Sequence, residues 1–506
     1  MGSPPNPPVR LCNSSIRPSK GRLCSLHGTT QSSLPVKYQS NIQQLANTAN
    51  YTTSDWESDI TLAQASSIDA FALNSGFGAN HTERALKDAF AVAKEQDFKL
   101  FFSLDYSGDG HWPKDQVVKI LSNYSAHEAY YRHDDGRALV STFEGFQSAG
   151  DWADIKKKVG KSVGNDTCCY FVPSWASAGV AKASMVAAID GLMSWDAWPY
   201  GNMEMNMTED KQFMDALEHE GKSYIMPVSP WFYTNLRQFN KNWVWQGDGL
   251  WPQRWQQVIE LQPEYVEILT WNDYGESHYI GPLREKATGV LESAGAPFDY
   301  VSGMPHDGWR TMLPYWISQY KAGAGQDASQ DTSQAAEIGD EVLSVWYRVS
   351  AANACGDGKT VGNSKSQGQT LLKPGEVLED KVFYSALLEG SADVKVSIGG
   401  ENRTAEWTDV PDGGRGVYTG AIPFDKHTGE VVVTLTRDGD FLAQMKGREI
   451  VGSCPGNLTN WNAWVGNATA VRANRAPGAG GDDSAGASMQ SSLWLLGLGL
   501  VLSLLI

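Results

Sequence analysis

Short apolar runs alternate with segments of helical period from about residue 60 to residue 320. This alternation is typical of βα units around a parallel sheet. Seven runs are visible: IDAFALN (68–74), KLFFSLD (99–105), RALVSTF (137–143), CCYFVPSW (168–175), IDGLMSWD (189–196), SYIMPVSP (223–230) and YVEILTW (265–271). A (β/α)8 barrel of the TIM type needs one more strand. We predict such a barrel over residues 36–321, with the eighth strand before residue 60.

The pattern changes after the barrel. Residues 322–340 are small and polar without any period, which indicates a linker. Four later runs alternate apolar and polar residues and are separated by turn residues: EVLSVWYRV, DKVFYSALL, ADVKVSIGG and EVVVTLTRD. They predict an antiparallel β-sandwich over residues 341–454. Residues 455–490 have the composition of a stalk, and residues 1–35 form an atypical leader that we expect to be disordered.

Charge and motifs exclude several classes of function. The chain has 58 acidic residues against 41 Lys and Arg, a net charge of −17, which argues against a nucleic-acid partner. No phosphate-binding Gly-Lys-Ser, no GxSxG and no His pair at metal spacing ends an apolar run. The 19 Trp exceed what a core needs, so many of the rings should line a binding surface. We expect a monomer.

The cysteines and the glycosylation sequons indicate an oxidising compartment. The six cysteines lack metal spacing, and we expect Cys355 to pair with Cys454. The sequon N-x-S/T is frequent and predicts a secreted glycoprotein. It occurs at Asn13, Asn50, Asn80, Asn123, Asn165, Asn206, Asn402, Asn457 and Asn467.

The two ends of the chain give conflicting indications about export. Residues 491–506 end in an apolar segment too short for the roughly 20 residues that span a bilayer. Small residues and a polar spacer precede it, as in a glycosylphosphatidylinositol (GPI) signal whose tail is removed, with Ser484, Gly481 or Gly478 as the attachment residue. The first 28 residues contain no apolar stretch of a signal peptide, so export is unconventional or the start of the chain is misassigned. We expect a cell-surface protein whose membrane contact is the lipid anchor.

Acidic and aromatic residues follow the predicted strands, at the end of a barrel where active sites gather. Carboxylates among tryptophans suit glycoside hydrolysis, which needs one carboxylic acid and one carboxylate, while aromatic rings stack on sugars. The densest segment is TWNDYGESHYIGP (270–282), with Asp273 and Glu276 three residues apart. An acid in a turn is more often a cap, and a tryptophan is as often part of the core. The strand-end residues are Asn74, Asp105, Glu144, Trp175, Asp196, Trp198, Trp231, Tyr233, Asn272, Asp273 and Glu276.

The segments IDAFALN, FFSLDYS, SWDAWP and WNDYGESHYIGP closely resemble those of the fungal α-1,3-glucanases, or mutanases, of glycoside hydrolase family 71. The resemblance runs from about Asn50 to Cys454. It implies endo-type hydrolysis of α-1,3-glucan, the expected polysaccharide partner, with inversion at the anomeric carbon and neither metal nor organic cofactor. Asp273 and Glu276 match the family's catalytic acids, and Asp105 matches a further essential aspartate.

We assign Glu276 as general acid and Asp273 as base, on the expectation that Glu276 occupies the drier setting. The residues expected to bind substrate are Asn74, Asp196, Trp198, Trp231, Tyr233, Trp271, Asn272, His278 and Tyr279.

One segment departs from the family pattern. VKYQSNIQQLANTAN (36–50) stands where the first strand should be, and it is polar and not strand-like. It predicts that the first strand is absent and that the barrel is open, which leaves backbone groups unpaired. Together with the abundant aromatic residues, this segment favours an alternative interpretation, a wall-anchored glucan-binding protein that has lost catalysis. A third interpretation, which does not depend on this segment, is a transglycosylase with a retaining mechanism.

Overall fold

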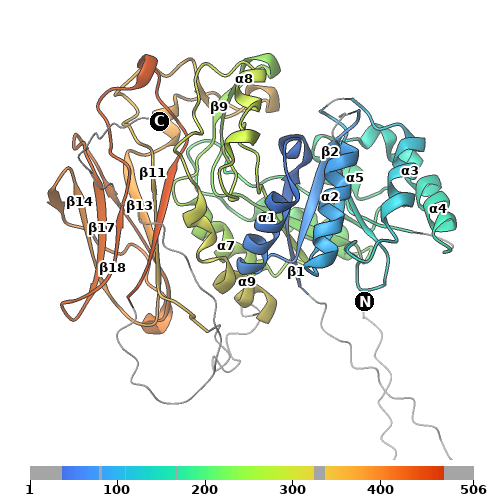
Figure 1. The fold of residues 1–506 in the computed structure, drawn as a ribbon, viewed down its shortest axis with the longest axis horizontal. Coiled ribbons are helices and arrows are strands. Elements are labelled where there is room, and N and C mark those ends of the chain that lie inside the picture. The colour runs from blue at the N-terminus through green and yellow to red at the C-terminus, as the bar shows by residue number, and fades with distance from the viewer. Residues whose placement is uncertain (1–36, 79–81, 109, 166–167, 324–336, 472–506) are drawn as a thin grey trace, which may run out of the picture.

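A computed structural model describes residues 37–78, 82–108, 110–165, 168–323 and 337–471 (Figure 1). Its first unit is built on an eight-stranded parallel sheet with the order β5-β4-β3-β2-β1-β10-β7-β6. The strands are β1 (Tyr38–Gln44), β2 (Ala70–Gly76), β3 (Lys99–Asp105), β4 (Leu139–Phe143), β5 (Tyr170–Phe171), β6 (Gly191–Met193), β7 (Ser223–Val228) and β10 (Tyr265–Ile268). Six of the seven apolar runs each contain one of these strands and the seventh, 68–74, overlaps β2, which confirms the predicted α/β barrel.

Backbone hydrogen bonds close the sheet between its two outer strands. The amide of Asp190 donates to the carbonyl of Phe171 at 2.8 Å, and the amide of Met193 donates to Pro173 at 3.0 Å. These bonds join the β5 and β6 edges, so the eight strands form a ring. The carboxyl ends of all eight strands therefore meet at one mouth.

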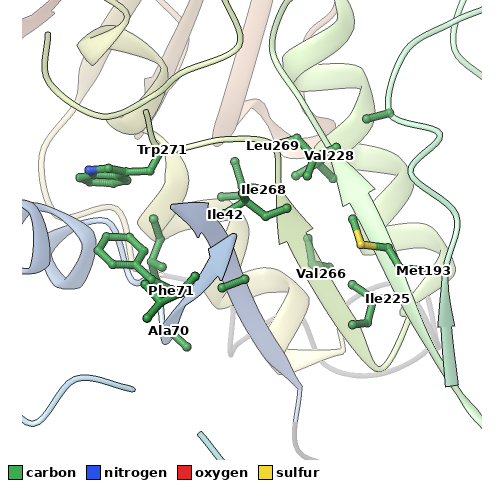
Figure 2. Close-up of a cluster of buried hydrophobic side chains, with 14 of the residues drawn as sticks. Ile42, Ala70, Phe71, Met193, Ile225, Val228, Val266, Ile268, Leu269 and Trp271 are labelled. Atoms are coloured by element: carbon green, nitrogen blue, oxygen red, sulfur yellow. The ribbon is translucent and has the colours of Figure 1, made fainter. Parts of the chain in front are cut away.

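The prediction that the first strand is absent is wrong. β1 lies between β2 and β10 and pairs in parallel with both, with Asn41 opposite Phe71 on one side and Ile268 on the other. Its polar side chains at Gln39, Asn41 and Gln43 are buried, and Ile42 packs in the apolar cluster around it (Figure 2). Pairing with a neighbour on each edge stabilises this strand despite its low apolar content. The prediction relied on apolar content and therefore missed the strand.

Helices follow most strands and cover the outside of the ring; α1 and α2 pack against one another beside β1 and β2 (Figure 1). Helix α2 shows why the helices pack on the sheet. One of its faces carries apolar residues at helical spacing, and all are buried: Leu86, Ala89, Phe90 and Ala93. The helices are α1 (Thr53–Ala65), α2 (Thr82–Glu95), α3 (Lys114–Tyr124), α4 (Trp152–Ser162), α5 (Val180–Ala183), α6 (Thr208–Glu218), α7 (Leu250–Leu261), α8 (Val290–Ser293) and α9 (Leu313–Ala322).

The second unit is an antiparallel β-sandwich, as predicted. One four-stranded sheet has the order β16-β13-β11-β19 and the other β15-β14-β17-β18, with an apolar core between them. The strands are β11 (Val342–Tyr347), β13 (Lys381–Leu388), β14 (Asp393–Ile398), β15 (Glu401–Arg403), β16 (Gly416–Pro423), β17 (Val431–Arg437), β18 (Asp440–Lys446) and β19 (Trp464–Thr469). Figure 1 shows them together in orange and red beside the barrel.

The expected end of the sandwich at Cys454 is too early. Strand β19 lies in the predicted stalk and pairs antiparallel with β11, from Val342 opposite Thr469 to Tyr347 opposite Trp464. The last strand thus returns to the first strand of its domain. The pattern escaped prediction because glycine and asparagine interrupt the apolar alternation in WVGNAT.

A small sheet joins the two units. It has the order β12-β9-β8 and contains β8 (Tyr233–Leu236) and β9 (Lys241–Val244) from the barrel. Its third strand, β12 (Val361–Gly362), comes from the segment between β11 and β13 and is followed by the short helix α10 (Pro374–Val377). The second domain therefore reaches into the rim of the barrel.

The predicted pairing of Cys355 with Cys454 is confirmed by a disulfide that links residues 99 apart in sequence. The adjacent cysteines 168 and 169 form a second disulfide. Cys12 and Cys24 lie outside the described residues, as do the leader, most of the linker and the apolar tail.

The sequon asparagines in the described part of the chain are all exposed, as glycosylation requires: Asn50, Asn123, Asn165, Asn206, Asn402, Asn457 and Asn467. Asn13 and Asn80 lie outside the described residues. Among the helices in the described ranges, none combines the length and apolar character needed to cross a bilayer.

Candidate active site

Two joined cavities of about 500 and 640 Å³ open at the carboxyl end of the barrel strands. The first, which we call the Asp273 chamber, is lined by Asn74, Gln44, Asp273 and His278 among others. The second, the Trp198 chamber, is lined by residues that include Asp196, Trp198 and Trp245. The residues common to both chambers include Asp105, Phe143, Trp195, Lys241 and Glu276. Asp105 and Glu276 thus stand where the chambers meet.

The loop after β10 places the two predicted catalytic acids. Its ends are paired, since the amide of Thr270 donates to the carbonyl of His278 and the amide of Ile280 donates back to Thr270, both at 2.8 Å. The Thr270 hydroxyl accepts the amide of Asp273 at 2.9 Å, and Asp273 Oδ1 accepts the amide of Glu276 at 3.0 Å. The sequence spacing of three therefore forms a closed turn in which one acid caps the other.

Glu276 lies in the centre of a charged cluster. Its Oε1 is 2.5 Å from Nζ of Lys241, and its Oε2 is 3.1 Å from Nε2 of His278. The same His278 nitrogen is 3.9 Å from Asp273 Oδ2. Ser277, between Glu276 and His278, has φ 58°, a left-handed conformation that turns both neighbours toward this cluster.

Aromatic rings surround the imidazole of His278 and exclude water from it. The rings of His278 and Phe232 are stacked with centroids 5.6 Å apart, and Trp198 meets His278 edge-on at 5.5 Å. Trp245 stacks on Trp198 at 5.1 Å. This low-polarity wall strengthens the electrostatic interactions of the acids beside it.

Burial and charge move the two carboxyl groups in opposite directions. For Asp273, burial and the neighbouring charge of Glu276 raise the pKa above its usual range. For Glu276, burial acts in the same direction, but Lys241 and His278 outweigh it and lower the pKa well below its usual range. The two shifts are opposite in sign, so Asp273 keeps its proton to a higher pH than Glu276 does.

Asp273, Glu276 and His278 are also of the types that bind metal ions, and their ligand atoms lie within 4.8 Å of one another. However, the ammonium group of Lys241 already contacts Glu276 and neutralises its charge. A second cation at this place would be repelled by Lys241. The cluster fits acid–base chemistry better than metal binding.

Asp105 and Asn74 come from the neighbouring strands β3 and β2, Asp105 at the predicted strand end and Asn74 two residues before the end of its strand. Asp105 ends β3, and its Oδ1 accepts the amides of Ser107 at 2.7 Å and Gly108 at 3.0 Å. Asn74 lies on β2 opposite Gln44 of β1, and both line the Asp273 chamber. Gln44 Nε2 is 3.5 Å from Asp273 Oδ2. β1, the strand that the sequence predicts to be absent, therefore contributes directly to the site.

Asp196 and Trp198 line the second chamber, as their strand-end positions suggested. The side chain of Asp196 is exposed and faces the cleft. Its restricted solvation, together with Glu209 and Asp210 nearby, raises the pKa of Asp196 to about 6 despite the opposing charge of Arg254. Asp196 is a third carboxyl group in the cleft with an altered pKa.

Five residues expected to bind substrate are buried and line neither chamber: Trp231, Tyr233, Trp271, Asn272 and Tyr279. Trp231 donates its indole N–H to the carbonyl of Trp461 at 3.0 Å, which fastens the barrel to the second domain. Asn272 exchanges hydrogen bonds with the backbone of Gln44 and holds the catalytic loop on β1. Their rings and amide are therefore not available to a sugar. Packing in the interior, and not the position after a strand, determines where these side chains point.

Sequence reasoning missed Lys241, Trp195 and Phe143. Lys241 begins β9, in a hairpin inserted after β7, and no local pattern relates it to Glu276. Trp195 and Phe143 are half-buried, their ring centroids are 4.5 Å apart, and both line the junction of the chambers. Trp195 stands next to Asp196 in the SWDAWP segment, so that segment contained a signal that could have identified it.

The sequence model of glycosyl hydrolase family 71 matches residues 43–477. This range covers most of the barrel and the whole β-sandwich, including β19. The chain belongs to glycosyl hydrolase family 71. The acid pair suggests glycoside hydrolysis, and the family match is to a glycosyl hydrolase. The two observations therefore agree.

Two named fungal proteins align over most of this chain. Glucan endo-1,3-alpha-glucosidase agn1 of Schizosaccharomyces pombe is 35% identical, with 83% of this chain and 92% of that protein aligned. Mutanase Pc12g07500 of Penicillium rubens is 31% identical, with 85% and 89% aligned. Among solved structures, the GH99 endo-alpha-mannosidase of Bacteroides thetaiotaomicron matches with a TM-score of 0.43 and 13% identity, covering 57% of this chain and 98% of that one.

Proposed function

We propose that this family 71 protein hydrolyses internal α-1,3-glucosidic bonds of glucan. The observation that carries the proposal is the pair Asp273 and Glu276 at the mouth of a closed barrel, where the pKa of Asp273 is raised and that of Glu276 is lowered. This is the combination that glycoside hydrolysis requires. The relatives named as endo-1,3-alpha-glucosidase and mutanase support α-1,3-glucan as the substrate.

We assign the roles from the electrostatics of the cluster. Asp273, with its raised pKa, is the general acid that protonates the leaving oxygen. Glu276, ionised beside Lys241, is the carboxylate that acts on water. This reverses the roles expected from the sequence, because the charge of Lys241 was not visible there. Asp105, at the junction of the chambers, stabilises the positive charge that develops on the sugar ring.

The two chambers support an endo mode of action. Since Asp105, Lys241 and Glu276 line both of them, glucan units can extend from the scissile bond in two directions. The binding-protein alternative rested on an open barrel, and the presence of β1 removes that reason.

The anomer of the first product tests the proposed reaction. Release of reducing ends from α-1,3-glucan is expected, and absence of release by the folded protein would contradict the function. A carboxylate oxygen of Asp273 lies within 4.8 Å of one of Glu276, close to the roughly 5–5.5 Å of retaining pairs and below the roughly 6.5–9.5 Å of inverting pairs. Both Glu276 oxygens, however, are held by Lys241 and His278, which opposes direct attack on carbon.

We therefore expect the inversion that the family resemblance implies. Proton NMR during the first minutes of reaction should detect the β-anomer at the new reducing ends. An α-configured first product would show retention, and it would assign Glu276 as a nucleophile and favour transglycosylation.

We also propose that the protein acts outside the cell on wall glucan, held by a C-terminal lipid anchor. The exposed sequons in the described residues support a secretory route, and one relative is named an ascus wall endo-1,3-alpha-glucanase. Phosphatidylinositol-specific phospholipase should release the protein from membranes of the producing cell. Protein that stays bound after this treatment, or that never enters the membrane fraction, would contradict the anchor.

A further inference from the structure

The second domain forms part of the cleft wall. Its strand β12 pairs in parallel with β9 of the barrel, with Val361 opposite Trp243 and Gly362 opposite Val244. The amide of Asn363 then donates to the carbonyl of Val244 at 2.9 Å. This pairing places the following residues, 364–370, along the rim of the Trp198 chamber.

Gln369 fixes the conformation of this rim segment. Its Oε1 accepts the indole N–H of Trp245 and the amide of Ser364, both at 2.8 Å. Its Nε2 donates to Oε1 of Gln367 at 3.2 Å. The hydroxyl of Tyr200, from the barrel, accepts the amide of Thr370 at 3.1 Å. Barrel side chains thus hold the segment, and Gln369 orients Gln367.

Ser366 and Gln367 are exposed and line the Trp198 chamber together with Trp195 and Trp198. An amide and a hydroxyl offer both donors and acceptors, which the hydroxyl groups of a sugar need. The aromatic wall of the same chamber offers apolar faces for the sugar ring. Asp196 adds a carboxyl group to the lining of this chamber.

We infer that the segment Asn363–Thr370 of the second domain forms a glucan-binding subsite on the Trp198 side of the scissile bond. In this subsite Gln367 hydrogen-bonds to a glucose hydroxyl, and Gln369 is a positioning residue. The inference rests on the proposed function and extends it, since it makes the β-sandwich a part of the substrate site. The barrel alone would then lack one side of its cleft.

Subsite mapping with the full-length protein tests this inference. We expect Gln367→Ala to lower kcat/KM about 3- to 10-fold on long α-1,3-gluco-oligosaccharides, the loss expected for one hydrogen bond to substrate. Oligosaccharides too short to enter the subsite should be cleaved at the wild-type rate. On end-labelled long oligosaccharides, the positions of cleavage should shift away from those that fill the Trp198 chamber. A merely structural residue would not change this pattern.

Gln444→Ala is the matched control, because Gln444 is an exposed glutamine on β18 and lines neither chamber. It should leave rate and cleavage pattern unchanged. Gln369→Ala should reproduce the shift of Gln367→Ala, since it releases the orientation of that side chain. Wild-type cleavage positions in both Gln367→Ala and Gln369→Ala would overturn the inference.

A binding measurement separates this inference from the proposed function. Calorimetric titration of Asp273→Asn with a long α-1,3-gluco-oligosaccharide should detect binding, which Gln367→Ala in the same background weakens about 3- to 10-fold. Equal affinity with and without Gln367 would overturn the subsite even if the wild type is active. If Gln367→Ala weakens binding as expected but the wild type releases no reducing ends, the subsite is supported and the proposed hydrolysis is contradicted.

Discussion

Asp273→Asn is expected to lower release of reducing ends from α-1,3-glucan by about 10²- to 10⁴-fold, the usual contribution of a general acid. Glu276→Gln should cause a loss of at least that size, because it removes the ionised carboxylate and leaves Lys241 unpaired. Both substitutions keep the shape of the side chain. The measurement is the initial rate on insoluble α-1,3-glucan at a fixed, mildly acidic pH.

A control for folding is needed because Asp273 accepts the amide of Glu276 and the Glu276 side chain contacts His278 of the same loop. The melting temperature and circular dichroism of each variant should remain near those of the wild type. Glu285→Gln provides the matched control, since Glu285 is exposed and lines neither chamber. Full activity in a folded Asp273→Asn or Glu276→Gln variant would contradict the assigned site.

Lys241→Met is expected to lower kcat/KM about 10- to 100-fold at acidic pH and to move the pH profile upward. With Lys241 present, the pKa of Glu276 is lowered, so Glu276 stays ionised as the pH falls through the acid range. Without it, burial raises that pKa, and the carboxylate is lost at a higher pH. Lys241 also lowers the pKa of Asp273, so its removal lets Asp273 stay protonated to a higher pH.

Both limbs of the kcat/KM profile should therefore shift in the same direction, to higher pH. Lys241→Arg should restore much of the original profile, since it keeps the charge. Lys211→Met, at an exposed position on α6, should leave the profile unchanged. Unshifted limbs in Lys241→Met would show that the ion pair does not control the ionisation of the acids.

The barrel could be predicted because seven of its strands are apolar and separated by helical segments. β1 could not, since it buries Gln39, Asn41 and Gln43 and depends on pairing with two neighbours. Such pairing between segments far apart in the chain is not encoded in local composition. β19 lies where the composition predicts a stalk, because Gly and Asn interrupt its apolar alternation, yet it completes the sandwich by pairing with β11.

The residues of the site also divide into those that the sequence indicates and those that it does not. Asp273, Glu276 and His278 come from one loop, which the sequence already marks as the densest group of polar and aromatic residues after a strand. Lys241 and Gln367 are brought to the cleft by an inserted hairpin and by the second domain, so their roles depend on contacts that the sequence does not display.

The predicted aromatic platforms also divide into two groups. Trp198 lines the cleft, whereas Trp231 and Tyr233 pack inside, although all three follow barrel strands. A tryptophan near a strand end is large enough to fill a domain interface as well as a binding surface. Residue type and position alone do not distinguish these uses.

An α-glycosyl fluoride of a short α-1,3-glucan tests the central claim, that Asp273 is the acid and Glu276 the ionised partner. Fluoride leaves without protonation, so a variant that lacks only the acid should regain activity on this substrate. The predicted result is near-wild-type turnover of the fluoride by Asp273→Asn and almost none by Glu276→Gln. Turnover by Glu276→Gln but not by Asp273→Asn would contradict the assignment and restore the opposite one.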